Sequence, residues 1–168
     1  MAALTDPQRA FLRDNPFVGT VTTLREDGSP HSTVVWFDAT DAVVRFNTAR
    51  GRAKARHLES DQRVSVAMID PQDAFKWVSV SGTAAVTEGG ADAHIDALAK
   101  KYLGADSYPF RNPAETRVIV SIKPEHVDSA GSTPCEGPGP APACSRDAHR
   151  VDRRQVVRDR HPALTRVG

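Results

Sequence analysis

The sequence contains little cysteine and no long apolar run. Among its 168 residues there are two cysteines, Cys135 and Cys144, and both follow the last aromatic residue, Phe110. Neither is expected to anchor a disulfide framework or a metal site within a fold. No stretch approaches the roughly 18 apolar residues that a membrane span requires, and no apolar stretch follows a basic start at the N-terminus. We therefore expect a cytoplasmic protein without a membrane partner.

Several signatures of catalytic chemistry are also absent. There is no P-loop, no GxGxxG run and no HExxH motif. The serines Ser29 and Ser32 lack the context of a nucleophile elbow, which disfavours hydrolysis. The histidines in the first part of the chain are scattered and are expected to have surface or capping roles: His31, His57, His94 and His126. No catalytic metal and no catalytic side chain is assigned.

Composition divides the chain into two parts. All ten aromatic residues lie at or before Phe110, whereas residues 129–168 are rich in proline, glycine and arginine. The second part carries a net charge of +3, which leaves −2 for residues 1–128 out of the total of +1. Such a segment buries too little apolar surface to offset its chain entropy. The sequence predicts one folded domain over residues 1–128 and a disordered tail over 129–168, to which no function is assigned.

The folded part is predicted to be mainly β. Thr5 and Asp6 before Pro7 start a short helix that Asn15 ends, and apolar spacing predicts a second helix over 91–103. Gly82 is expected to mark a bulge, and Pro124 to end the last strand. The predicted strands are 17–24, 31–38, 42–48, 63–69, 76–86 and 117–123. Without regular alternation of strand and helix, they favour a six-stranded antiparallel barrel with two or three short helices.

One segment concentrates positive charge. Between Asp41 and Glu59 there are five cationic side chains and no acid: Arg45, Arg50, Arg52, Lys54 and Arg56. Four of them fall where a strand ends and a helix begins, and a helix N-terminus offers unpaired amides and partial positive charge to an anion. Gly51, Ala55 and Leu58 are expected to form the buried stripe of this helix. The alternative, an ordinary solvated basic face, remains open.

Within this segment, a hydroxyl, two arginines and a lysine are the candidate phosphate ligands: Thr48, Arg50, Arg52 and Lys54. Arg56 is a poorer candidate because Glu59, three residues later, can pair with it.

The run FNTARGRAKARHL, followed by DQRVSVAMIDP and VSVSGTA, resembles the pyridoxamine-phosphate-oxidase-like split β-barrels. More narrowly, it resembles the branch that uses the deazaflavin coenzyme F-420, and the likeness extends over residues 5–127. The resemblance implies a homodimer with the coenzyme in a groove at the dimer interface. It implies that Thr48, Arg50, Arg52 and Lys54 hold the phosphate and acidic tail. The ring system would then lie near Val35 and Trp36, with Trp77 close by.

The resemblance also implies the activity, which is hydride transfer from coenzyme F-420 to a small organic acceptor, with any proton coming from solvent. The last strand, RVIVSIKPEHV, lacks the arginine-rich signature of true pyridoxamine-phosphate oxidases, so vitamin B6 chemistry is not expected.

Other interpretations remain open. Trp36 is also explained as a core or interface aromatic, and Trp77 as a residue at the end of the barrel. The chain could instead use FMN as an enzyme or flavin-binding protein, or carry a coenzyme without turnover. A nucleic-acid-binding module is disfavoured, because the core is net acidic and lacks interleaved surface aromatics.

Overall fold

A computed structural model of the chain describes residues 2–131, which fall within one compact unit, Met1–Cys135. The predicted tail lies outside the described residues from residue 132 onward, and so do Cys135 and Cys144. No helix in the described part of the chain is long and apolar enough to cross a membrane.

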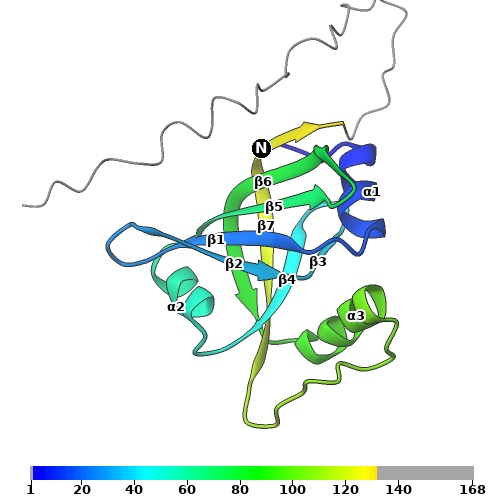
Figure 1. Cartoon of the computed structure of the whole chain (residues 1–168). Coiled ribbons are helices and arrows are strands. Elements are labelled where there is room, and N and C mark those ends of the chain that lie inside the picture. The colour runs from blue at the N-terminus through cyan, green and yellow to red at the C-terminus, as the bar shows by residue number, and fades with distance from the viewer. Residues whose placement is uncertain (1, 132–168) are drawn as a thin grey trace, which may run out of the picture. The chain divides into compact units, whose positions relative to one another are not determined.

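The fold is a seven-stranded antiparallel sheet with three helices, and its strand order is β2-β1-β5-β6-β7-β4-β3 (Figure 1). This mainly β architecture confirms the predicted split-barrel class. The strands are β1 (Gly19–Leu24), β2 (Pro30–Val35), β3 (Phe37–Ala39), β4 (Val44–Ala49), β5 (Arg63–Asp70), β6 (Asp73–Thr87) and β7 (Arg117–Ala130). The helices are α1 (Asp6–Asp14), α2 (Ala53–Ser60) and α3 (Ala91–Leu103).

The seventh strand arises because the chain changes partner at Trp36. Val35, at the end of β2, pairs with Gly19 of β1, whereas Phe37, at the start of β3, pairs with Phe46 of β4. β2 and β3 are the two outer strands of the sheet order, so Trp36 joins its two edges. A Cβ atom at Gly19 would lie 2.2 Å from the Phe37 ring, so this crossing requires a glycine beside it. The predicted continuous strand 31–38 is therefore wrong.

Alternating apolar residues fill the inside of the sheet. On β5 the predicted inward residues Val64, Val66 and Met68 are all buried. Phe37 and Phe46 meet edge to face with ring centroids 6.3 Å apart, and both are fully buried. Leu12 of α1 and Leu58 of α2 join the same core. A tightly packed interior of this kind holds the strand ends in place, and the strand ends carry the candidate site.

The last strand continues past Pro124 to Ala130, so the prediction that Pro124 ends it is wrong. A bulge explains the difference, because Gly82 pairs with Pro124 while Ser81 pairs with His126, which leaves Glu125 as an extra residue. Proline has no N–H to donate and is tolerated at bulges. The predicted irregularity at Gly82 is confirmed. Ser129 and Ala130, assigned to the tail, pair with β6.

Local signals place the helices. Thr5 forms a capping box with Gln8 at the start of α1, and Asn15 follows its end as predicted. α3 has the predicted bounds and ends at Gly104, which has a φ of +70°. α1 lies beside the β5–β6 hairpin, whereas α3 lies beside the first half of β7 (Figure 1).

Candidate functional site

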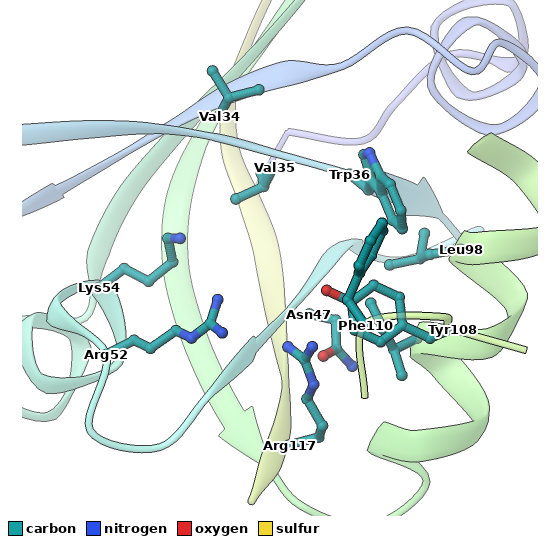
Figure 2. A pocket seen from close by; sticks show the side chains of 11 residues that line it. Val34, Val35, Trp36, Asn47, Arg52, Lys54, Leu98, Tyr108, Phe110 and Arg117 are labelled. Atoms are coloured by element: carbon teal, nitrogen blue, oxygen red, sulfur yellow. The ribbon is translucent and has the colours of Figure 1, made fainter. Parts of the chain in front are cut away.

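A cleft of about 210 Å³ opens where the β2–β3 crossing, α2, α3 and the start of β7 come together (Figure 2). Cations lie at one end of it and aromatic rings at the other. Its lining consists of Val34, Val35, Trp36, Asn47, Arg52, Lys54, Ile95, Leu98, Tyr108, Phe110 and Arg117. Segments far apart in the sequence therefore build one concave surface that is polar at one side and apolar at the other.

Lys54 and Arg52 form the basic end. Lys54 is half-buried in the first turn of α2, and burial together with the nearby charge of Arg52 lowers its pKa. No carboxylate within residues 2–131 lies within 4.0 Å of its amine. Arg52 is the N-cap residue of α2, and its side chain does not cap the helix. The start of this helix therefore combines a free ammonium group with helix-terminal amides, which suits an anion.

Arg52 itself is already held in place. Its Nη2 atom donates to both carboxylate oxygens of Glu115, at 2.7 and 3.0 Å. This hydrogen bond is the main reason that the pKa of Glu115 is lowered, although burial opposes the shift. Arg52 is about half exposed, so an anion in the cleft can compete with Glu115 for its guanidinium group.

The other two predicted phosphate ligands do not line the cleft. Thr48 is 1% exposed and lies on the same side of β4 as the buried Val44 and Phe46, which faces the barrel interior. Arg50 is exposed and pairs with Glu88 and, at 3.9 Å, with Glu59.

Two expectations for this helix are wrong. Gly51 is exposed, with a φ of +76° that suits a glycine in a turn, so the buried stripe consists of Ala55 and Leu58 without it. Arg56 donates to the backbone oxygen of Gly51, and Glu59 lies near Arg50 instead.

Aromatic rings form the opposite wall. Trp36 stacks on Tyr102, and Tyr108 lies nearly perpendicular to Trp36 at a centroid distance of 6.0 Å. Phe110 continues the wall, 5.7 Å from Tyr108, and is 68% exposed. Such rings provide a flat apolar surface for a conjugated ligand.

The segment that carries Tyr108 and Phe110 is fastened to α3. Asp96 of α3 accepts from the backbone N–H of Tyr108 at 2.8 Å and from Arg111 at 2.8 and 2.9 Å. These bonds lower the pKa of Asp96, most of all the backbone bond from Tyr108. These bonds therefore hold Tyr108 and Phe110 in a fixed position relative to α3.

Asn47 and Arg117 lie between the two ends, and sequence reasoning missed both. Arg117 is 8% exposed, and its guanidinium carbon lies 4.8 Å from the centre of the Tyr108 ring. The side-chain amide of Asn47 donates to the backbone oxygen of Ala91 at 2.8 Å. Nothing in the local sequence separates Arg117 from an ordinary arginine at the start of a strand, because its burial depends on the distant α3 and Tyr108.

A polar network lies behind Asn47. His94 of α3 is buried, so the expected surface or capping role is wrong for this histidine, and its Nε2 atom lies 3.3 Å from Asp38. Burial opposes the charge on Asp38, but the neighbouring His94 and the hydrogen bonds from Arg45 hold the pKa of this carboxyl below its usual range. This network fixes the helix against β3 and β4 and thereby the back of the cleft.

The predicted ring-binding residues are divided between two places. Val35 and Trp36 line the cleft. Trp77 lies on β6, opposite Ile69 and Ala130, and is not part of the lining. No group of three or more potential metal ligands occurs within the described residues.

Comparisons with known proteins agree on one family. The sequence profile of the family described as pyridoxamine 5'-phosphate oxidase matches residues 4–130. The chain is 32% identical, over 127 residues, to a protein of Mycobacterium tuberculosis (strain CDC 1551 / Oshkosh) named "F420H(2)-dependent biliverdin reductase". That alignment covers 74% of this chain and 86% of the relative.

Solved structures give the same fold. One with the name "F420 Reductase" superposes with a TM-score of 0.62 at 26% identity, covering 71% of this chain and 94% of that one. The conserved hypothetical protein Rv2991 from Mycobacterium tuberculosis also gives a TM-score of 0.62, at 24% identity, over 82% of this chain and 94% of its own.

Proposed function

The chain belongs to the pyridoxamine 5'-phosphate oxidase family, and from this membership we propose that it is an oxidoreductase that uses the deazaflavin coenzyme F-420. The coenzyme would bind in the cleft and supply hydride for the reduction of a small organic acceptor. Relatives named for F-420 chemistry, at 32% and 26% identity, support this choice over FMN.

The observation that carries the proposal is the free ammonium group of Lys54 at the start of α2. Lys54 is half-buried and has no carboxylate partner within residues 2–131, so it fits the phosphate of a coenzyme, and Arg52 beside it can supply a second contact. The aromatic wall at the far end fits a conjugated ring. The phosphate and the ring system of the coenzyme thus fit the two ends of one cleft.

The residues of the cleft act by binding and positioning. When bound, the reduced coenzyme supplies hydride by its own chemistry. Lys54 and Arg52 hold the anionic end, while Trp36 and Tyr108 limit where a ring can lie. Ile95 and Leu98 of α3 keep water from the back of the cleft. We assign no proton-transferring side chain, and any proton comes from solvent.

A second copy of the chain completes the site in this proposal. A cleft of about 210 Å³ is smaller than typical ligand pockets, which span about 300–1,000 Å³, so it is too small for a coenzyme and an acceptor together. Val34, at the lip of the cleft, is 67% exposed. It pairs with Thr20 of β1, which also pairs with Ala67 of β5, so the three side chains share the outer face of the sheet. Val18 and Ile69, both about half exposed, extend that apolar surface. We propose that this face packs against its copy in a homodimer.

Bilins are the acceptors to test first, because the 32% identical relative is named as a biliverdin reductase. Turnover is measured as the consumption of reduced coenzyme on addition of biliverdin. Tight coenzyme binding without turnover of any acceptor would favour a carrier over an enzyme.

The direct test is fluorescence titration of the protein with F-420 and, separately, with FMN. Lys54→Ala is expected to weaken F-420 binding by roughly 5- to 150-fold, which corresponds to about 1–3 kcal/mol for a charged hydrogen bond. Lys100→Ala is the matched control, because Lys100 is exposed on α3 outside the cleft. Unchanged affinity in Lys54→Ala would remove the assignment, and binding of FMN alone would reject the deazaflavin.

A further inference from the structure

The floor of the cleft holds a buried arginine with an N–H donor that no described residue satisfies. Arg117 is 8% exposed, and its Nη2 atom is buried without a hydrogen-bond partner among residues 2–131. Within the range 2–131 no carboxylate lies within 4.0 Å of its guanidinium group. The nearby acid, Glu115, is engaged by Arg52 through both of its oxygens. Leaving a buried charge unpaired is costly, so its presence points to a ligand that accepts from it.

Asn47 presents the complementary group. Its Nδ2 atom donates to the backbone oxygen of Ala91 at 2.8 Å and lies 3.4 Å from Nδ1 of His94. Rotating the amide by half a turn would place Oδ1 next to the Ala91 oxygen, and two acceptors cannot form a hydrogen bond. These contacts therefore determine which atom of the amide is Nδ2 and which is Oδ1. The free Oδ1 atom is buried and has no hydrogen-bond partner in the part of the chain that the structure describes. Asn47 therefore offers an acceptor where Arg117 offers a donor.

The sheet register brings the two groups to the same place. Ala49 of β4 pairs with Arg117 of β7, and Asn47 pairs with Ile119. Asn47 and Arg117 are thus diagonal neighbours on one face of adjacent antiparallel strands, a spacing that long side chains can bridge. Both line the cleft, and Figure 2 shows the amide and the guanidinium group between the basic end and the aromatic wall.

We propose that Arg117 and Asn47 together bind a lactam edge, in which a carbonyl oxygen accepts from Arg117 and the adjacent N–H donates to Asn47. A carboxylate would satisfy Arg117 but would set an oxygen against Oδ1 of Asn47, whereas a lactam satisfies both. The inference rests on the proposed function and refines it. Two molecules of that function carry this edge: the pyrimidinedione ring of the deazaflavin and the terminal rings of a bilin.

Two binding measurements separate these sources. The first is the dissociation constant for F-420 by fluorescence titration, and the second is the KM for biliverdin at saturating reduced coenzyme. We expect Arg117→Met to weaken one of them at least tenfold and Asn47→Ala to weaken the same one severalfold. An effect on the dissociation constant assigns the lactam to the coenzyme, and an effect confined to KM assigns it to the acceptor. No change in either would overturn the inference.

A ligand-free measurement distinguishes binding from a structural role. Methionine keeps an apolar stem against Tyr108 but removes the unpaired charge, so the melting temperature of ligand-free Arg117→Met should be unchanged or higher. A fall of several degrees would show that Arg117 supports the fold and would overturn the inference without any ligand. Arg63→Met is the control, because Arg63 also begins a strand but is exposed and pairs with Asp61.

The proposed function can fail separately. Wild-type protein that binds neither F-420 nor biliverdin contradicts that function, whatever the variants do. Wild-type protein that binds normally, with Arg117→Met indistinguishable from it, contradicts only the lactam contact.

Discussion

The indole of Trp36 lies almost parallel to the ring of Tyr102, with centroids 5.2 Å apart and an interplanar angle of 8°. The Tyr102 hydroxyl accepts from the backbone N–H of Phe37 at 3.0 Å and lies 3.0 Å from the oxygen of Phe17, to which it can donate. Burial raises the pKa of this phenol, so it keeps its proton. One side chain of α3 thus supports both the Trp36 ring and the backbone that crosses between the edges of the sheet.

Tyr102→Phe should keep the stacking but leave the part-buried Phe37 N–H without its acceptor. We expect a loss of about 1–3 kcal/mol in the free energy of unfolding, measured by urea denaturation. Tyr108→Phe is the control, since its hydroxyl makes no hydrogen bond to the part of the chain that the structure describes. Equal stability of the two variants would refute this role for Tyr102.

Glu115→Gln should tighten the binding of F-420. The carboxylate competes with an anionic ligand for Arg52 and repels it, and an exposed ion pair of this kind contributes up to about 1 kcal/mol. The expected gain is therefore up to about fivefold, measured by fluorescence titration at low salt. Weaker binding would mean that Glu115 positions Arg52 for the ligand.

Glu88→Gln tests Arg50 in the same way. Arg50 pairs with Glu88 outside the cleft. If Arg50 binds the acidic tail of the coenzyme, as the resemblance to the family implies, releasing it should tighten F-420 binding. Unchanged affinity would leave Lys54 and Arg52 as the principal cationic contacts.

The affinity for F-420 should fall at alkaline pH because of Lys54. Burial and the charge of Arg52 lower the pKa of its amine below the ordinary lysine value of about 10.4. An anion binds the protonated form, so affinity stays constant below that lowered pKa and decreases as the pH rises through it. Titrations between neutral pH and about pH 10 should show the decline in wild type and a weaker one in Lys54→Ala. Parallel curves for the two proteins would contradict the assignment.

Gly82→Ala should destabilise the sheet at the bulge. A Cβ atom at this position would lie 1.9 Å from the backbone oxygen of Lys123, which cannot move without disturbing β7. The expected cost is about 1–3 kcal/mol or more in the free energy of unfolding. At Gly89, by contrast, a Cβ atom meets nothing within 4 Å, so Gly89→Ala is the matched control. A neutral Gly82→Ala would show that the two strands can separate at little cost.

The elements predicted well are those with local signals. The capping box at Thr5 and the terminal Gly104 are both encoded within a few residues of the helices that they bound, α1 and α3. The break at Trp36 depends instead on two strand pairings that involve β1 and β4, and the continuation past Pro124 depends on a bulge opposite Gly82. Neither the break nor the continuation is visible in the residues around it, although Gly82 itself indicates the bulge.

The same distinction applies to the site. Charge clustering points to Arg52 and Lys54, which the structure places together at one end of the cleft, while their contacts with a coenzyme remain predictions. Thr48 faces the interior because strand alternation places it with Phe46, and Arg50 pairs outside the cleft, so their proposed contacts remain predictions. Arg117 becomes a candidate only when the fold buries it.

The attachment of the Tyr108 segment to α3 has a consequence for how selectivity could diverge among related proteins. Residues 91–116 supply Ile95, Leu98, Tyr108 and Phe110, whereas the cations proposed to bind the anionic end lie at the start of α2. The surface proposed for the coenzyme ring and the acceptor can therefore change by exchange of one continuous stretch of chain, while the proposed contacts of Lys54 and Arg52 stay the same. A chimera that takes this stretch from a relative should shift its acceptor preference toward that of the relative and keep the contribution of Lys54 to coenzyme affinity.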